Sequence, residues 1–227
     1  MVFTNHLFPT PIAVAQQMWT FLVSGKLLSD MGKTLSRAAI AFVVAMAIGG
    51  VIGVILGRVR IADRLFASWV IIGLNMPAVV IAIALYIWLG LTEFALILAV
   101  IINKIPLVIV TIREGVRSFS RDYDELALAY RMPLGRRLRY IFVPQLTPYV
   151  MAAARNGLAL VWKIVLVFEV IGSDGGIGFR IAALFQFFDI KGILAYTTAF
   201  ILVVIVFEYG IMRPLEHWAL KWRTDPV

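Results

Sequence analysis

An uncharged apolar run over residues 38–57 constrains this chain more than any other feature of its sequence. Arg37 precedes the run and Arg58 follows it. A helix rises about 1.5 Å per residue, so the run is long enough to cross the hydrocarbon core of a bilayer, which is about 30 Å thick. Hydrophobic residues make up 62% of the 227 residues, against about 45–50% in a soluble domain. The chain is therefore predicted to be an integral membrane protein.

Four further apolar runs have the length of a membrane span. They cover residues 67–90, 94–112, 146–168 and 192–212. The predicted fold is all-α: a polytopic membrane protein with about five transmembrane helices. These spans fall in a domain over residues 37–213, with a connecting loop at 113–145 and a tail at 214–227.

The first 36 residues are less apolar and are predicted to form a separate N-terminal segment. Prolines at positions 9 and 11 open a helix there, and its apolar face is made by Ile12, Ala15, Met18, Trp19 and Leu22. This pattern is typical of an amphipathic helix lying at the membrane surface. An ordinary packed helix accounts for the pattern equally well.

Three glycines recur every fourth residue in the first span, at Gly49, Gly53 and Gly57. Residues four apart share one face of a helix. Small residues at this spacing let two helix backbones approach closely in a membrane. The glycine stripe therefore predicts a close helix–helix contact.

The distribution of basic residues predicts which loops face the cytoplasm. The segments at 58–64, at 113–145 and after Met212 share one side and hold thirteen of the 21 Lys and Arg residues, while the other side holds five. Basic residues accumulate on the cytoplasmic side, so the N-terminus is predicted outside and the C-terminus inside. Topology thus accounts for the net charge of +8, and nucleic-acid binding is not expected.

The stretch over residues 124–144 is the most polar long segment of the chain. Acidic residues come first, a break at Met132-Pro133-Leu134-Gly135 follows, and basic residues come after it. Pro133 cannot continue a helix, and Gly135 can adopt backbone angles that other residues avoid. The pattern predicts two short helices joined by a sharp turn. A charged helical hairpin of this kind on a membrane protein is typical of a docking surface for a soluble protein.

Nothing in the sequence points to catalysis, to a metal or to a cofactor. The chain has no cysteine, and its two histidines, His6 and His217, stand near opposite ends. A glycine-rich phosphate loop ending in Lys and Ser or Thr is also missing from the sequence. The chain is not expected to be an enzyme, and any ATP is expected to bind another subunit.

The polar stretch resembles the EAA loop of ABC-importer permeases, the binding-protein-dependent inner-membrane family. Glu125, Leu126 and Ala127 hold the positions of Glu-Ala-Ala in that loop, and Pro144 holds the position of its closing proline. Arg131 stands where the family usually has glycine. This departure bears on the geometry of the turn, which Pro133 and Gly135 are expected to relocate.

In that family the loop forms coupling helices, which insert into a groove of a cytoplasmic ATPase. The resemblance therefore implies that Glu125, Leu126, Ala127, Leu134 and Gly135 couple the chain to an ATPase. The Glu125 carboxylate would pair with a basic residue of that partner. A solvated loop charge is the alternative reading of Glu125.

The likeness covers about residues 8–223 and is nearest to the nitrate, sulfonate and taurine branch. It includes the opening Phe8-Pro9-Thr10-Pro11, the residues Arg155, Trp162 and Glu169 spaced by seven, the loop at 175–178, and a basic tail up to Arg223. Members of that branch usually carry a further span before the Pro-x-Pro opening. This chain is therefore either naturally short or begins downstream of the true start.

The resemblance implies the transmembrane permease subunit of an ATP-driven importer, located in the cell inner membrane. Its solute would be small and anionic or zwitterionic, such as a sulfonate, taurine or nitrate. Its partners would be two cytoplasmic ABC ATPase subunits, a second permease copy or a similar permease, an extracytoplasmic solute-binding protein and membrane lipid. The alternative is a stand-alone secondary transporter or channel, which would not account for the EAA-like spacing.

Five residues in the spans are candidates for the translocation pathway: Lys104, Asn75, Arg155, Trp162 and Lys163. Ionisable groups at membrane depth are costly and usually face a cavity or a partner. We therefore expect Lys104, and with less support Lys163, to make the pathway electropositive. A structural ion pair or snorkelling to the interface is the alternative for both lysines. Asn75 precedes Pro77, and a packing kink is the more frequent explanation of such a pair.

Overall fold

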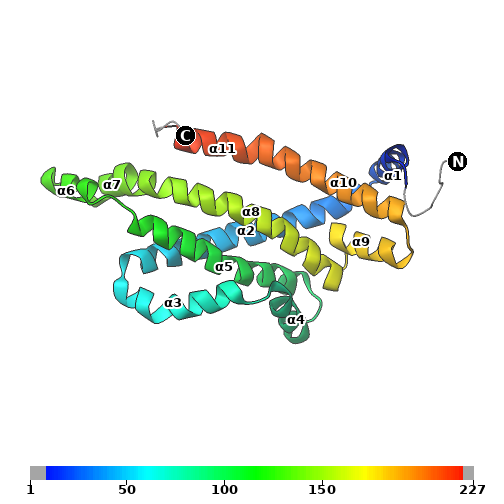
Figure 1. Cartoon of the computed structure of the whole chain (residues 1–227), viewed down its shortest axis with the longest axis horizontal. Coiled ribbons are helices and arrows are strands. Elements are labelled where there is room, and N and C mark those ends of the chain that lie inside the picture. The colour runs from blue at the N-terminus through cyan, green and yellow to red at the C-terminus, as the bar shows by residue number, and fades with distance from the viewer. Residues whose placement is uncertain (1–8, 222–227) are drawn as a thin grey trace. The chain divides into compact units, whose positions relative to one another are not determined.

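The computed structural model of the protein describes residues 9–221, apart from the side chain of Asp124. Phe8 of the predicted opening motif and tail residues 222–227 lie outside the described residues. Within this part of the chain the structure consists of helices and short connections, with no strand. The helices run from α1 (Pro11–Val23) to α11 (Arg213–Leu220), from blue to red in Figure 1. The predicted all-α class is confirmed.

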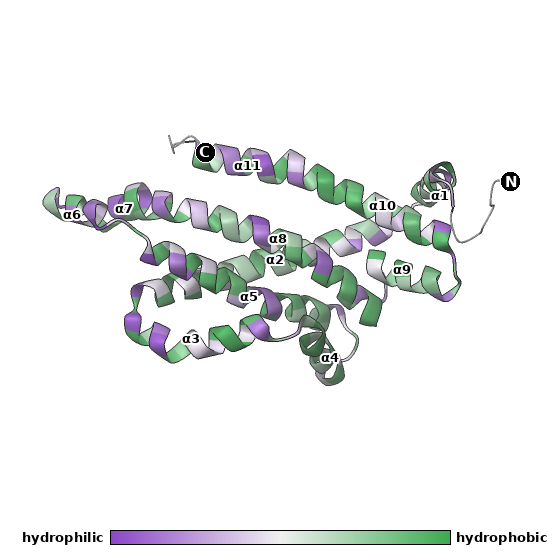
Figure 2. Ribbon diagram, in the orientation of Figure 1, coloured by the Kyte–Doolittle hydropathy of each residue, from purple (hydrophilic) through white to green (hydrophobic). Residues whose placement is uncertain are grey.

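Within residues 9–221, four helices are long and apolar enough to cross a membrane. They span Lys26–Arg58, Glu93–Arg117, Leu134–Gly172 and Ile190–Leu220. A shorter pair, α3 (Arg60–Asn75) and α4 (Ala78–Leu89), is bent by 93° at the break between them. With that pair taken as one span, the described residues contain five spans, as predicted. Figure 2 shows hydrophobic residues along α4 and α10, and hydrophilic residues frequent in α6, α7 and α11.

The break between α3 and α4 lies at the Asn75 and Pro77 positions that the sequence singled out. Met76, which precedes the proline, is extended, with φ −73° and ψ 122°. Proline disfavours the helical conformation in the residue before it, and its own nitrogen donates no hydrogen bond. The chain therefore leaves one helix at Asn75 and begins the next at Ala78.

The helices extend beyond the apolar runs that predicted them. Helix α2 (Lys26–Arg58) begins well before residue 38, and α10 (Ile190–Phe207) continues through a π-helical turn (Glu208–Met212) into α11. Both predicted domain boundaries, at 36/37 and at 213/214, thus fall inside continuous helices. Hydropathy misses the start of α2 because that part contains charged residues, among them Asp30 and Arg37, which pair with Arg180 and Glu169.

The described residues group into two compact units. The first contains the residues up to Ala41, Pro77–Val100 and Val161–Ile211. In it, α1 and α9 (Ile177–Gln186) both pack against α10. The rings of Phe21 and Tyr196 join α1 to α10 at 5.1 Å between centroids. The surface location predicted for the N-terminal helix stays a prediction.

The second unit contains Phe42–Met76, Ile101–Leu160 and the residues from Met212 onwards. The glycine stripe of α2 lies against Val108, Ile112 and Val116 of α5 (Glu93–Arg117). A Cβ atom placed on Gly53 would come within 2.8 Å of the Ile112 Cβ. The predicted close contact between α2 and α5 is therefore confirmed. A larger side chain on this stripe would push the two backbones apart.

Candidate functional site

The predicted docking loop begins with helix α6 (Arg121–Ala129). The hydroxyl of Ser120 caps this helix by accepting a hydrogen bond from the backbone N–H of Asp122, at 3.3 Å. The side-chain oxygen of Gln145 accepts a hydrogen bond from the Ser120 N–H, at 3.1 Å. These two bonds satisfy N–H groups that a helix start leaves without intrahelical partners. The helix therefore begins ahead of the stretch that the sequence marked out.

A tight backbone turn ends α6. The N–H of Met132 donates to the carbonyl of Ala127 at 2.9 Å, and the N–H of Arg131 donates to that of Leu128 at 3.0 Å. This pair of bonds is a Schellman motif, whose key residue adopts a left-handed conformation and is usually glycine. Here Arg131 adopts that conformation, with φ 45°. Arg131 stands where the resembled family usually has glycine, and its backbone adopts the conformation that glycine adopts most easily.

The expectation that Gly135 relocates the bend is wrong. Gly135 lies inside α7 (Leu134–Arg137) and is not among the residues with positive φ. The bend is made by Arg131 and by Pro133, which is extended with ψ 149° just before α7. The sequence misled here because a glycine two residues after a proline is a common signal of a turn.

The second helix of the predicted hairpin is not a short one. Helix α7 passes through a π-helical turn (Leu138–Phe142) into the long helix α8 (Val143–Gly172). Pro144 lies just after this turn, and a proline lacks the N–H that a regular helix needs. A π-helical turn is one of the ways in which a helix accommodates such a defect. The predicted docking loop therefore ends in the tip of a span.

Most of the predicted coupling residues lie at the surface. Leu134 is 77% exposed, Leu126 is 45% exposed, and Glu125 and Gly135 are also exposed. Ala127 is 3% exposed, and its carbonyl closes the turn. Leu126 and Leu134 are thus left uncovered by the rest of the described chain. Four of the five predicted coupling residues are thus exposed, while Ala127 is buried and helps to form the turn.

Arg37 of α2 is the centre of a buried ionic cluster in the first unit. Its side chain is only 2% exposed and donates to Glu169 at 3.0 Å, to Glu93 at 2.6 Å and to Asp174 at 3.1 Å. It also donates to the carbonyl of Gly175, at 2.6 Å. A buried charge is tolerated only when it is paired and hydrogen-bonded. The cluster therefore ties α2 to the start of α5 and to the end of α8.

Glu169 is the buried partner that Arg37 depends on. Its carboxylate also accepts hydrogen bonds from the hydroxyl of Thr34 and from the backbone N–H of Gly178, both at 2.9 Å. Glu169 is 0% exposed. The sequence marks Glu169 only through the family resemblance, and Arg37 only as the residue before the first apolar run. The signal available in the sequence was an ionisable residue at the end of an apolar run. This signal did not show that Arg37 and Glu169 pair with each other.

Lys104 on α5 is 2% exposed. Its ammonium nitrogen has no hydrogen-bond partner among the described residues. A Cβ atom placed on Gly157 of α8 would lie 2.6 Å from that nitrogen, so the glycine leaves the space that the lysine occupies. A buried ammonium without a partner is costly. Lys104 is therefore a buried donor without a partner among residues 9–221.

The other four pathway candidates have different surroundings. Asn75 is exposed and donates to the carbonyl of Ile71 at 2.8 Å, while Arg155 donates to Glu216 at 3.0 Å. Trp162 is buried, and its ring meets Phe200 and Phe207 edge-on. Lys163 is exposed. Their role in a pathway stays a prediction. Within residues 9–221, no three His, Asp or Glu side chains are placed to hold a metal ion.

Most of the chain matches a known protein family. Residues 47–211 match the family described as "Binding-protein-dependent transport system inner membrane component". The chain belongs to this family. It is 23% identical over 224 residues to the putative aliphatic sulfonates transport permease protein SsuC of Bacillus subtilis, covering 99% of this chain and 81% of that protein.

Other relatives of the permease carry different substrate names. It is 28% identical over 221 residues to the riboflavin transport system permease protein RibX of Chloroflexus aurantiacus, covering 96% of this chain and 81% of that protein. Its fold matches the inward-facing MetNI methionine ABC transporter with a TM-score of 0.72 and 15% identity, over 85% of this chain and 95% of the other. The permease is thus a multi-pass inner-membrane protein, and its family implies ATPase subunits and a substrate-binding protein as partners.

Proposed function

We propose that the permease forms the solute pathway of an ATP-driven importer and is driven by an ATPase that binds the loop of α6 and α7. The observation that carries this proposal is the exposure of Leu126, Leu134 and Glu125, on two helices held by a tight turn. Apolar side chains in a rigid, charged loop suit a groove on a soluble partner. Since α7 continues into α8, movement of the partner would be passed to the membrane part.

The proposed assembly is a homodimer, or a pair with a similar permease, with two ATPase subunits on the cytoplasmic side. The basic residues of the α6–α7 loop support a cytoplasmic location for that loop, because basic residues accumulate on the cytoplasmic side. The N-terminus then lies outside and the C-terminus inside. A solute-binding protein delivers substrate on the outer side. Closing of the ATPases around ATP draws the loops together and opens the pore outward, and hydrolysis resets it.

Co-purification tests this function. The tagged full-length permease, extracted in mild detergent from its native membrane, is expected to bring down an ATPase subunit in about equal amount. The permease alone is expected to hydrolyse no ATP. A cysteine placed at Arg136 should react only with reagents that cross the membrane. Labelling of that cysteine from outside the cell, or a permease that transports without any ATPase, would contradict the proposal and favour a stand-alone transporter.

The proposed solute is small and carries a negative charge. Relatives bear names for both sulfonates and riboflavin, so names alone do not choose a substrate class. The unpartnered ammonium of Lys104, buried at the middle of α5, supports an anionic group passing nearby. Lys104 attracts that group at some stage of the transport cycle, and the solute supplies the counter-charge.

Lys104→Met tests this assignment and separates it from a structural role. Methionine fills a similar volume without a buried charge, so the thermal stability of the permease is expected to stay the same or to rise. Uptake of an anionic solute is expected to fall at least about tenfold, since a charged hydrogen-bond partner is worth about 1.5–3 kcal/mol. Lys191→Met, a change at an exposed lysine, is the control. Unchanged uptake, or a clear loss of stability, would reject the pathway role.

A further inference from the structure

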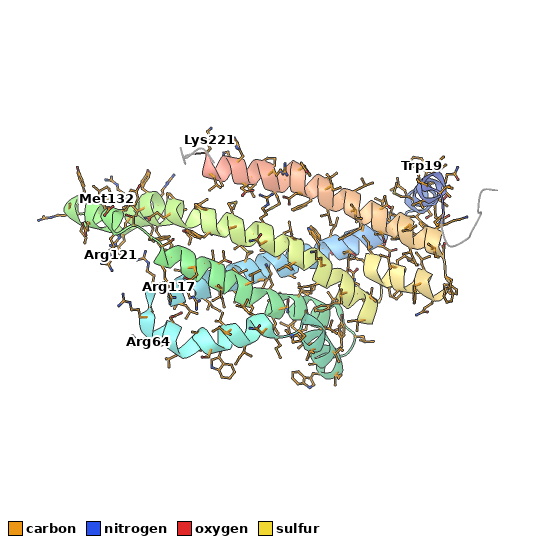
Figure 3. The ribbon with its side chains drawn as sticks, viewed as in Figure 1. Trp19, Arg64, Arg117, Arg121, Met132 and Lys221 are labelled. Carbon is orange, nitrogen blue, oxygen red and sulfur yellow. The ribbon has the colours of Figure 1, made fainter. Side chains whose placement is uncertain are left out.

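A cationic pocket lies in the second unit, where α2, α3, α5 and α6 begin or end. Its volume is about 670 Å³. Five arginines and one aspartate line it: Arg58, Arg60, Arg64, Arg117, Arg121 and Asp63. Figure 3 labels Arg64, Arg117 and Arg121, which approach this place from three different helices. None of these residues is used by the coupling contact or by the pathway proposed above.

The single acidic residue of the pocket is already neutralised. Asp63 pairs with Arg117 and, at 3.2 Å, with Arg113. Among the described residues, no carboxylate pairs with Arg60, Arg64 or Arg121. Several guanidinium groups around one cavity repel one another, and the repulsion is relieved when an anion enters. The pocket therefore has the charge of an anion-binding site, and three of its arginines, Arg60, Arg64 and Arg121, lack a carboxylate partner within the described part of the chain.

The shape of guanidinium groups narrows the class of anion. Each guanidinium presents a planar fork of N–H donors that matches two oxygens of a phosphate. The Arg58 guanidinium is held 4.9 Å above the ring of Phe142, which fixes one of these donors in place. Arginines rather than lysines supply all the positive charge of the lining. A phosphate group is the ligand that this set of donors fits best.

Helix α3 runs from the pocket and presents an apolar stripe to its surroundings. Four apolar residues share one face of this helix by their spacing. They are Ile61, Leu65, Trp69 and Ile72, which are 72%, 66%, 69% and 57% exposed. In Figure 2 the start of α3 is hydrophilic and hydrophobic residues follow it. The pocket lies at the end of the span α2 and of the span α5, which is the level of lipid headgroups. Tryptophan is also enriched near that level.

We propose that this pocket binds the phosphate of an anionic membrane lipid, with its acyl chains along the exposed stripe of α3. A free phosphate ion would meet the same arginines but would leave that stripe without a role. Basic pockets at the cytoplasmic ends of spans favour anionic headgroups. Because α6 begins at Arg121, the bound lipid borders the docking loop. This inference does not depend on the importer function, since it concerns binding alone.

Lipid titration of the purified permease tests the proposal. The full chain, with any subunits that co-purify, is titrated in detergent with phosphatidylglycerol, phosphatidylcholine or inorganic phosphate, and binding is followed by thermal shift and native mass spectrometry. Phosphatidylglycerol is expected to bind and to stabilise, while phosphatidylcholine and inorganic phosphate have much weaker effects. The double variant Arg64→Gln/Arg121→Gln is expected to bind phosphatidylglycerol about tenfold to thirtyfold more weakly, since each basic residue near the headgroups adds to the attraction.

Two control variants make the result decisive. Lys26→Gln/Lys191→Gln removes the same charge at two exposed lysines outside the pocket and should bind as the unchanged protein does. Arg64→Lys/Arg121→Lys keeps the charge and should recover most of the binding. If the distant lysine variant lost as much phosphatidylglycerol binding as Arg64→Gln/Arg121→Gln, the binding would be general charge attraction, and the proposed site would be wrong. Equal stabilisation by inorganic phosphate, or loss of ATPase co-purification without loss of lipid, would overturn the lipid assignment.

Discussion

Glu169→Ala is expected to cost the permease about 3–5 kcal/mol of stability, the range for breaking a buried ion pair by removing one partner. Arg37 would keep its charge, because a guanidinium does not lose its proton in a protein. Its side chain is 2% exposed, so water cannot take the place of the carboxylate. Thr34 and the N–H of Gly178 would lose their acceptor as well. The loss should therefore exceed that of any single exposed pair.

The measurement is the melting temperature of the detergent-solubilised permease, which is expected to fall on the order of 10 °C. Glu93→Ala and Asp174→Ala are matched controls, because both carboxylates also contact Arg37 but are 57% and 74% exposed. Each should cost no more than about 1 kcal/mol. The double change Arg37→Met/Glu169→Met should recover much of the loss, since no buried charge is left alone. Equal melting temperatures for Glu169→Ala and Glu93→Ala would reject this account.

This ion pair also marks what the sequence could not reveal. Local patterns predicted the spans and the glycine stripe, because hydropathy and spacing are properties of neighbouring residues. Arg37 and Glu169 are 132 positions apart, and no local rule connects them. For the same reason the first predicted span, over residues 38–57, begins later than α2 does. Asp30, which interrupts hydropathy there, is buried by partners on other helices: Arg180 and Tyr196 both donate to its carboxylate, at 2.9 and 3.0 Å.

The docking loop was predicted in place but not in detail. Charge pattern and EAA-like spacing located it, and the turn after Ala129 appears where the break was expected. The sequence assigned the unusual backbone conformation to Gly135, whereas Arg131 adopts it. A non-glycine residue takes a positive φ only when surrounding bonds hold it there. The bonds from Arg131 and Met132 to the end of α6 do so, and they cannot be inferred from residue types alone.

Leu134→Asp is expected to abolish ATP-driven uptake, to below about 5% of the unchanged permease. Leu134 is 77% exposed and opens α7 directly after the turn. Burying a leucine in a partner contributes about 1.5–3 kcal/mol, and an aspartate there would also place an unpaired charge in the interface. By contrast, Glu125→Ala should reduce coupling less, because an exposed ion pair is worth about 0–1 kcal/mol.

The position offers a graded series that separates docking from folding. Leu134→Met should retain uptake, Leu134→Ala should keep a part of it, and Leu134→Asp should lose it together with co-purification of the ATPase. Leu215→Asp, at a 43% exposed leucine of α11 outside the loop, should retain both. All variants should reach the membrane in normal amount and melt as the unchanged protein does, since the side chain at 134 packs against little of its own chain. If Leu134→Asp still bound the ATPase and transported normally, the ATPase would have to act on this permease somewhere other than the tip of α7.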